Sequence, residues 1–167
     1  MDIRYENTFK DMIKFNLFHL ARMRVQQVSW LVVIVAIAII FWTIIDSVEI
    51  LFIAKVVLLV LVESVILAFL AAITFLSIIF AYTPGKNKGI LTEHHLKLLS
   101  TGLVEETSIN TTSHSWAGIV DISQNRDYIF IYVTQHAAHV IPKKAFKSRD
   151  EATVFFQYAY QLWKPST

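Results

Sequence analysis

Two long apolar runs, separated by a short polar stretch, constrain this chain more than any other feature of its sequence. The first run, residues 28–45, reads VSWLVVIVAIAIIFWTII, and the second covers residues 50–82. A helix rises 1.5 Å per residue, so about 20 apolar residues cross the roughly 30 Å hydrocarbon core of a bilayer. The second run is longer than one upright span needs, which predicts tilt or a first turn at the interface. We therefore expect a hairpin of two transmembrane helices over residues 28–82, with the second span near residues 56–80.

Two other interpretations of these runs fit less well. A cleaved signal peptide is disfavoured because the first run begins late, lacks an A-x-A-like cleavage site and is followed at once by another apolar run. A buried hairpin of a soluble protein is disfavoured by composition, since 55% of the residues are hydrophobic and 17% are charged, against about 45–50% and about 25% in soluble domains. Residues 28–82 contain four acidic or basic side chains, those of Asp46, Glu49, Lys55 and Glu63.

Charges at the ends of the runs predict an orientation. Arg22 and Arg24 precede the first run, Lys86 and Lys88 follow the second, and the connecting stretch is acidic. Basic residues favour the cytoplasmic side of a membrane. We expect a multi-pass protein with both termini in the cytoplasm.

Five residues inside the second run invite separate interpretations. Ser64, Ala68 and Ala72 recur at four-residue spacing, which lets helices approach closely, either within the hairpin or in a homodimer. Lys55 is expected to extend its ammonium group toward the interface. Glu63 is expensive in hydrocarbon, so we expect a protonated acid that hydrogen-bonds across the hairpin, although intramembrane carboxylates are also functional candidates. A transport pathway would need more polar groups than these spans supply.

The N-terminal segment, residues 1–27, predicts a cytoplasmic amphipathic helix. Thr8 followed by Asp11 resembles a capping pair, and the apolar side chains that follow cluster on one helical face. The sequence is equally compatible with two placements of this helix, one on the inner leaflet and one packed on the C-terminal domain.

After a linker at residues 83–89, the pattern changes to short segments separated by turns, which predicts a small cytoplasmic α+β domain over residues 90–167. Ser148 and Glu151 form a capping box that opens a final helix. This order of about seven strands and one closing helix is typical of a pleckstrin-homology-like (PH-like) domain. The expected strands are residues 90–93, 95–99, 103–107, 110–115, 119–123, 128–133 and 138–141.

Three short motifs carry a family resemblance. They are the sequences WAGI at residues 116–119, IPKKAF at residues 141–146 and FNLFHLAR at residues 15–22. With the helical hairpin and the terminal helix, they make the chain similar to YcxB-like bacterial membrane proteins. The resemblance implies this architecture and a bacterial plasma membrane, and it brings no catalytic residues.

The sequence offers little support for an enzyme. It contains no cysteine, which excludes thiolate chemistry and cysteine-based zinc sites. The six histidines form no H-E-x-x-H motif, and neither a phosphate-binding loop nor a nucleophile elbow is present. We expect scattered surface histidines, no metal and no cofactor, and we expect Trp116 and Phe146 to lie in the domain core.

The densest positive charge is the candidate binding site. It comprises Lys143, Lys144, Lys147 and Arg149, with Lys86 and Lys88 of the linker beside them. A solvated loop before a helix is one interpretation, and contact with anionic headgroups of the inner leaflet is the other. Nucleic acid is disfavoured because no aromatic residues interleave the patch and the net charge of the chain is only +2.

These observations favour a non-enzymatic, membrane-anchored binding or regulatory protein whose domain contacts a protein partner or the inner leaflet. The alternative is an immunity protein that neutralises a membrane-active toxin through its hairpin. A transporter subunit that uses Glu63 is a third and weaker hypothesis. The expected partners are the lipid bilayer, a protein partner or toxin, and a second copy of the chain.

Overall fold

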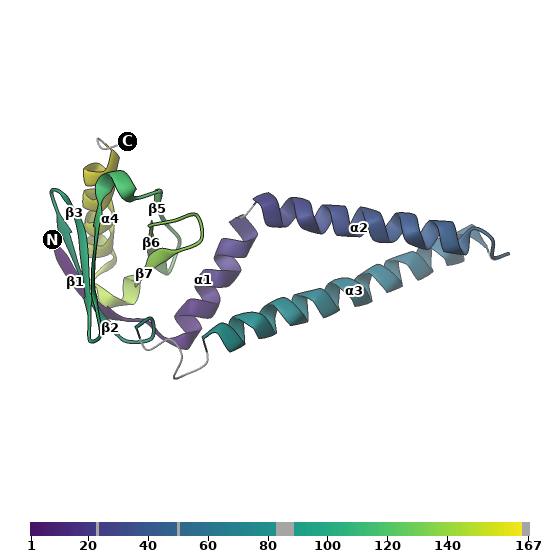
Figure 1. Cartoon of the computed structure of the whole chain (residues 1–167), viewed down its shortest axis with the longest axis horizontal. Helices are drawn as coiled ribbons and strands as arrows, with labels where there is room; N and C mark the ends of the chain where they lie inside the picture. The colour runs from purple at the N-terminus through teal and green to yellow at the C-terminus, as the bar shows by residue number, and fades with distance from the viewer. Residues whose placement is uncertain (23, 50, 83–88, 165–167) are drawn as a thin grey trace. The chain divides into compact units, whose positions relative to one another are not determined.

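The structure is a computed structural model that describes residues 1–22, 24–49, 51–82 and 89–164 (Figure 1). The chain divides into two compact units. One, here called the sheet unit, combines Met1–Phe15 with Tyr82–Thr167, and the other, here called the helix unit, is Asn16–Ala81. The sheet unit is therefore built from both ends of the sequence.

The helix unit contains two long apolar helices, α2 (Arg24–Ile45) and α3 (Phe52–Ala81). Both are long and apolar enough to cross a membrane. At the turn between them, the Lys55 ammonium group donates to the carbonyl of Asp46 over 3.1 Å. This bond satisfies one of the carbonyls that the end of a helix leaves without an intrahelical partner. Trp42 and Phe52 also meet edge to face, with ring centroids 5.8 Å apart.

A four-stranded antiparallel sheet opens the sheet unit, and its first strand lies before the apolar helices in the sequence. Its order is β1 (Asp2–Glu6), β2 (Glu93–Leu99), β3 (Gly102–Thr107) and β4 (Thr111–Ser115). Asp2 pairs with Lys97 and Glu6 with Glu93. The helices are thus an insertion between two neighbouring strands. The prediction of one helical segment over residues 1–27 missed β1, although its sequence DIRYE alternates polar and apolar residues as a half-buried strand does.

The second sheet contains β5 (Asp121–Gln124), β6 (Tyr128–Tyr132) and β7 (Ala138–Pro142), all antiparallel. Helix α4 (Arg149–Trp163) follows it. The predicted capping box is present, since the Ser148 hydroxyl accepts from the N–H of Glu151 and the Glu151 carboxylate accepts from the N–H of Lys147. Two short strands were expected at residues 90–93 and 95–99. The structure has one strand there, β2, and residues 90–92 precede it.

Side chains from both sheets and from α4 form the core of the sheet unit. Alternate residues of β2 point inward, with Leu96 and Leu98 at most 2% exposed, and Phe155 of α4 is completely buried. Trp116 is 2% exposed and Phe146 is 8% exposed, which confirms their predicted place in the core. The Trp116 indole also donates to the carbonyl of Leu99 over 2.9 Å, so its polar end is satisfied.

Helix α1 (Phe9–Arg22) begins on the sheet unit. All five residues of β6 are buried. The Phe15 ring lies 5.7 Å from Phe130 and 6.3 Å from Tyr132. Met12 and Phe15 are 3% and 6% exposed. The sequence left two placements open for this helix, on the inner leaflet or on the C-terminal domain. The first half of α1 packs on the domain.

Candidate anion-binding cleft

A cleft of about 500 Å³ opens on the surface of the sheet unit. Its walls come from the first turns of α1, the turn between β5 and β6, the segment after β7 and the start of α4. The lining residues are Lys10, Asp11, Lys14, Arg126, Asp127, Tyr128, Pro142, Lys143, Lys144, Phe146 and Arg149. Six of these side chains are basic and two are acidic, so the cleft carries an excess of four positive charges.

Asp11 fixes the start of α1 beside the cleft. Its side chain is 5% exposed, and its two oxygens accept from the Thr8 N–H at 2.9 Å, the Thr8 hydroxyl at 2.6 Å and the Tyr128 hydroxyl at 2.6 Å. The Lys144 ammonium group lies 3.3 Å away. Burial alone would raise the pKa of Asp11, but the hydrogen bonds from Thr8, Tyr128 and Lys144 together lower it. Asp11 is thus an ionised anchor that joins α1 to β6.

Two of the other cations in the cleft also have partners. Lys14 pairs with Asp127 at 3.0 Å, and Lys143 donates to the side-chain oxygen of Gln124 at 2.7 Å. Burial, together with the charge of Arg149, lowers the pKa of Lys143. Burial is the larger cause, and the repulsion from Arg149 adds to it.

Three cations remain without such partners. The side chains of Lys10, Arg126 and Arg149 make no ion pair or hydrogen bond with any residue that the structure describes. Guanidinium groups present a planar set of donors that suits carboxylate and phosphate oxygens. The arrangement can therefore hold an anion.

The C-terminal part of the chain is similar to a known protein family. Residues 98–157 match the model of the family described as YcxB-like protein. This chain carries a YcxB-like domain. No curated protein and no solved structure matches the chain.

The match confirms the predicted family resemblance for the C-terminal part. The matched residues of the YcxB-like domain run from the end of β2 into α4. They include Arg126, Lys143 and Arg149 of the cleft, whereas Lys10 and Lys14 come from outside them.

The predicted basic residues separate into three groups. Lys143, Lys144 and Arg149 line the cleft. Lys147 is exposed and does not line it. Lys86 and Lys88 lie outside the described residues.

Sequence reasoning missed three of the cleft cations, Lys10, Lys14 and Arg126. The spacing of Lys10 and Lys14 places them one turn apart on the polar face of a helix, which was a usable signal. Nothing in the sequence placed that helix beside the turn after β5. The missing information was therefore tertiary.

The polar and small residues of α3 lie on different faces. Glu63 is partly buried, as are Leu59, Ile66 and Leu70 at helical spacing. No hydrogen bond or ion pair joins Glu63 to a residue in the described part of the chain, so the bond expected across the hairpin is absent.

Ser64, Ala68 and Ala72 are exposed. The Ser64 hydroxyl donates to the carbonyl of Val60 within the same helix, over 2.7 Å. The expected packing of this small-residue stripe inside the hairpin is therefore not seen.

The histidines of the sheet unit depart from the expected scatter over the surface. His94 is 5% exposed. The ring nitrogens Nδ1 of His94 and His139 lie 3.0 Å and 2.9 Å from the same oxygen of Glu105. Glu105 on β3 and His139 on β7 belong to different sheets, so these side chains, 34 residues apart in the sequence, meet between the two sheets. Among the described residues no group of three or more histidine, aspartate or glutamate side chains is arranged to hold a metal ion.

Proposed function

We propose that this chain is a non-enzymatic binding protein anchored in the bacterial plasma membrane, whose cytoplasmic sheet unit contacts anionic headgroups of the inner leaflet through the cleft. The observation that carries the proposal is the excess of four positive charges in the cleft, together with three cations that have no ion pair or hydrogen bond among the described residues. Each Lys or Arg near an anionic leaflet contributes about 1 kcal/mol. Six cations would supply several kcal/mol at moderate salt.

The exposure of the apolar helices supports anchoring in a membrane. On α3, Ile53, Phe80 and Val65 are 74%, 71% and 69% exposed. Among the described residues of α3, one side chain is buried, that of Ile78. Apolar surface of this extent in water is costly at about 25 cal/mol per Å², whereas hydrocarbon removes that cost.

Strand pairing supports a two-span arrangement. β1 precedes the apolar helices, β2 follows them, and the two strands are neighbours in one sheet. If α2 and α3 each cross the bilayer, both ends of the hairpin return to the same side, as this pairing requires. The basic residues that flank the hairpin favour the cytoplasm as that side.

The sheet order supports a binding role for the sheet unit. The sheet unit has one sheet of four strands, one of three strands and a closing helix. We propose that it is a PH-like domain.

The test uses the full chain in detergent and two deacylated lipids, which are water-soluble and do not enter micelles. Glycerophosphoglycerol, which is anionic, and glycerophosphocholine, which is zwitterionic, are titrated by calorimetry. We expect saturable binding of the anionic lipid, weakened at least about tenfold in the double variant Arg126→Gln/Arg149→Gln, since each charged hydrogen bond is worth about 1.5–3 kcal/mol.

Arg4→Gln is the matched control, because Arg4 is an exposed arginine of β1 outside the cleft. Equal affinity for the two lipids, or unchanged binding by the double variant, would contradict the proposal. Loss of a co-purifying acidic protein from the double variant, with lipid binding intact, would instead identify a protein partner.

A further inference from the structure

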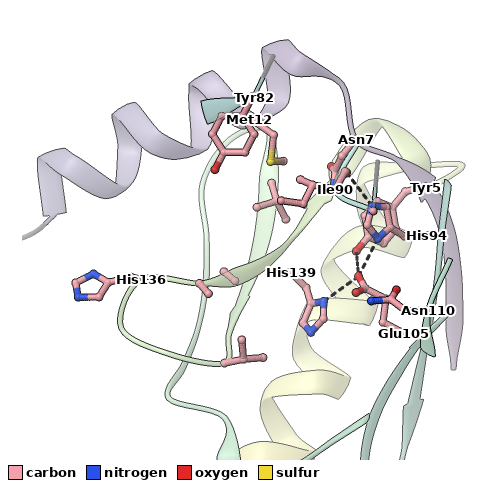
Figure 2. A pocket seen from close by; sticks show the side chains of 15 residues that line it. Tyr5, Asn7, Met12, Tyr82, Ile90, His94, Glu105, Asn110, His136 and His139 are labelled. Atoms are coloured by element: carbon pink, nitrogen blue, oxygen red, sulfur yellow. Dashed lines mark hydrogen bonds and ion pairs between the residues drawn. The ribbon is translucent and has the colours of Figure 1, made fainter. Parts of the chain in front are cut away.

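A second hollow of the sheet unit lies beside the buried histidines (Figure 2). Its volume is about 370 Å³, within the range of about 300–1,000 Å³ typical of small-molecule sites. Apolar side chains form much of its wall, among them Met12, Val133, Ala138 and Val140. Glu105 on β3 provides a carboxylate in the same wall.

Three donors converge on one oxygen of that carboxylate. Oε1 of Glu105 accepts from the Tyr5 hydroxyl at 3.2 Å and lies 3.0 Å and 2.9 Å from Nδ1 of His94 and His139. These groups come from β1, β2 and β7, and Figure 2 shows them directed toward Glu105. Burial alone would raise the pKa of Glu105, but the hydrogen bonds from the two histidines bring it well below its usual range. The carboxylate is therefore ionised.

The positive charge of His94 faces the Glu105 carboxylate. His94 places Nδ1 against the Glu105 carboxylate and Nε2 against the carbonyl of Ile90, both at 3.0 Å. Both partners are acceptors, so both ring nitrogens must carry protons, and His94 is an imidazolium. It neutralises Glu105. Nδ1 of His139 donates to the same oxygen, and Nε2 of this ring is buried.

The acceptors of the cluster are not all used. Oε2 of Glu105 receives no hydrogen bond from the described residues, although it is accessible. Nε2 of His139 is buried and also lacks a partner among them. A carboxylate that His94 neutralises, and whose Oε2 accepts no bond from the described residues, favours an uncharged ligand that donates hydrogen bonds.

We propose that this pocket binds a small uncharged molecule with one or more hydroxyl groups, which donates to Oε2 of Glu105 and packs its carbon skeleton on the apolar wall. A free cation would meet the His94 imidazolium, and a free anion would meet the unshielded oxygen of Glu105. This site is separate from the basic cleft and shares no lining residue with it.

The experiment titrates the full chain, in a detergent without a sugar headgroup, with glycerol and myo-inositol as uncharged hydroxylated probes. Acetate and ethylammonium are the charged probes of comparable size. Calorimetry measures affinity, and the ¹⁵N resonance of His139 Nε2 reports contact at the cluster. We expect saturable binding of at least one hydroxylated probe and weaker binding of both charged probes.

Two variants and one control locate the binding. Glu105→Gln exchanges an acceptor for an amide, and Ala138→Leu fills the pocket while leaving the hydrogen bonds in place. Each should weaken binding about tenfold or more. Glu106→Gln is the control, because Glu106 is the next residue on β3 and pairs with Lys97 instead, and it should bind as the wild type does.

Three results would overturn the proposal. They are saturation by neither hydroxylated probe, tighter binding of acetate or ethylammonium, and wild-type affinity in a folded Ala138→Leu. If circular dichroism shows that Glu105→Gln does not fold, Ala138→Leu decides by itself.

Discussion

Phe155 of α4 and Phe69 of α3 are identical side chains on two helices of one chain, yet Phe155 is 0% exposed and Phe69 is 65% exposed. In the sheet unit, burial against neighbouring side chains stabilises the fold. In the helix unit, apolar side chains point outward along most of α3, and packing within the hairpin covers few of them. The difference fits the proposed anchoring, in which water surrounds the sheet unit and hydrocarbon surrounds the helix unit.

The polar side chains of the two units also differ in their hydrogen-bond partners. In the sheet unit, Asp11 and Glu105 each accept from three different side chains. In the helix unit, Lys55 and Ser64 donate to backbone carbonyls. The described residues offer Glu63 no hydrogen bond. Side-chain networks thus specify the sheet unit, whereas Lys55 and Ser64 of the helix unit bond to backbone carbonyls instead.

The largest expected effect compares the two phenylalanines directly. Phe155→Ala should lower the free energy of unfolding of the detergent-solubilised chain by about 3–5 kcal/mol, because it leaves a cavity in a packed core. Phe69→Ala should change it by less than about 0.5 kcal/mol, because its ring is exposed and detergent covers it. Urea denaturation followed by near-ultraviolet circular dichroism measures both, and equal losses would break the comparison.

A smaller effect is expected at the anchor of α1. Asp11→Asn should lower the free energy of unfolding by about 1.5–3 kcal/mol, because charged hydrogen bonds from Tyr128 and Lys144 are lost. Hydrogen exchange in the first turns of α1 should accelerate with it. Asp150→Asn is the control, since Asp150 is an exposed acid in the first turn of α4. Unchanged exchange in Asp11→Asn would show that the network does not hold α1.

The pH dependence of stability should reflect His94. Burial lowers its pKa, but the bonds to Glu105 and the Ile90 carbonyl raise it above the usual value near 6.5 overall. A raised folded-state pKa contributes stability that is present below pH about 6.5 and is lost as the pH rises through the folded value.

The other groups around His94 are Tyr5, Glu105, His139 and, beyond His139, His114. The pKa of His114 is lowered by burial and by His139, so its contribution has the opposite sign. The difference in unfolding free energy between wild type and His94→Gln isolates the His94 term, and it should shrink from pH 6 to pH 8. A difference that grows with pH would contradict the assignment.

The smallest effect is expected at Glu63. Glu63→Gln and Glu63→Leu should each change stability by no more than roughly 0.6 kcal/mol, the average for hydrogen bonds inside membranes, because no partner is lost. Expression and oligomeric state should also be unchanged. Loss of a cellular phenotype in Glu63→Gln at a normal protein level would instead indicate a functional carboxylate.

Long-period patterns made much of this fold predictable. The apolar runs marked α2 and α3, and Ser148 with Glu151 marked the start of α4. β1 was missed because its role depends on a partner strand that begins 91 positions later, at Glu93. The cleft was half predicted for the same reason, since the local sequence showed Lys143, Lys144 and Arg149 but not the approach of α1. The Glu105 cluster was not predicted, because strand pairing and sheet packing bring its members together.

Two hypotheses from the sequence stay predictions. Toxin immunity and a homodimer through the exposed stripe of Ser64, Ala68 and Ala72 are compatible with the fold, and no observation favours either.

Cysteine accessibility tests the central claim, that α2 and α3 cross a membrane while the sheet unit stays on one side. The chain has no cysteine, so single substitutions report one position each. Ser47, in the turn after α2, and Ser108, between β3 and β4, are both exposed. A membrane-impermeant maleimide should label Ser47→Cys in intact cells and Ser108→Cys only after the cells are opened. Labelling of Ser108→Cys from outside, or identical labelling of both positions in intact cells, would contradict the claim.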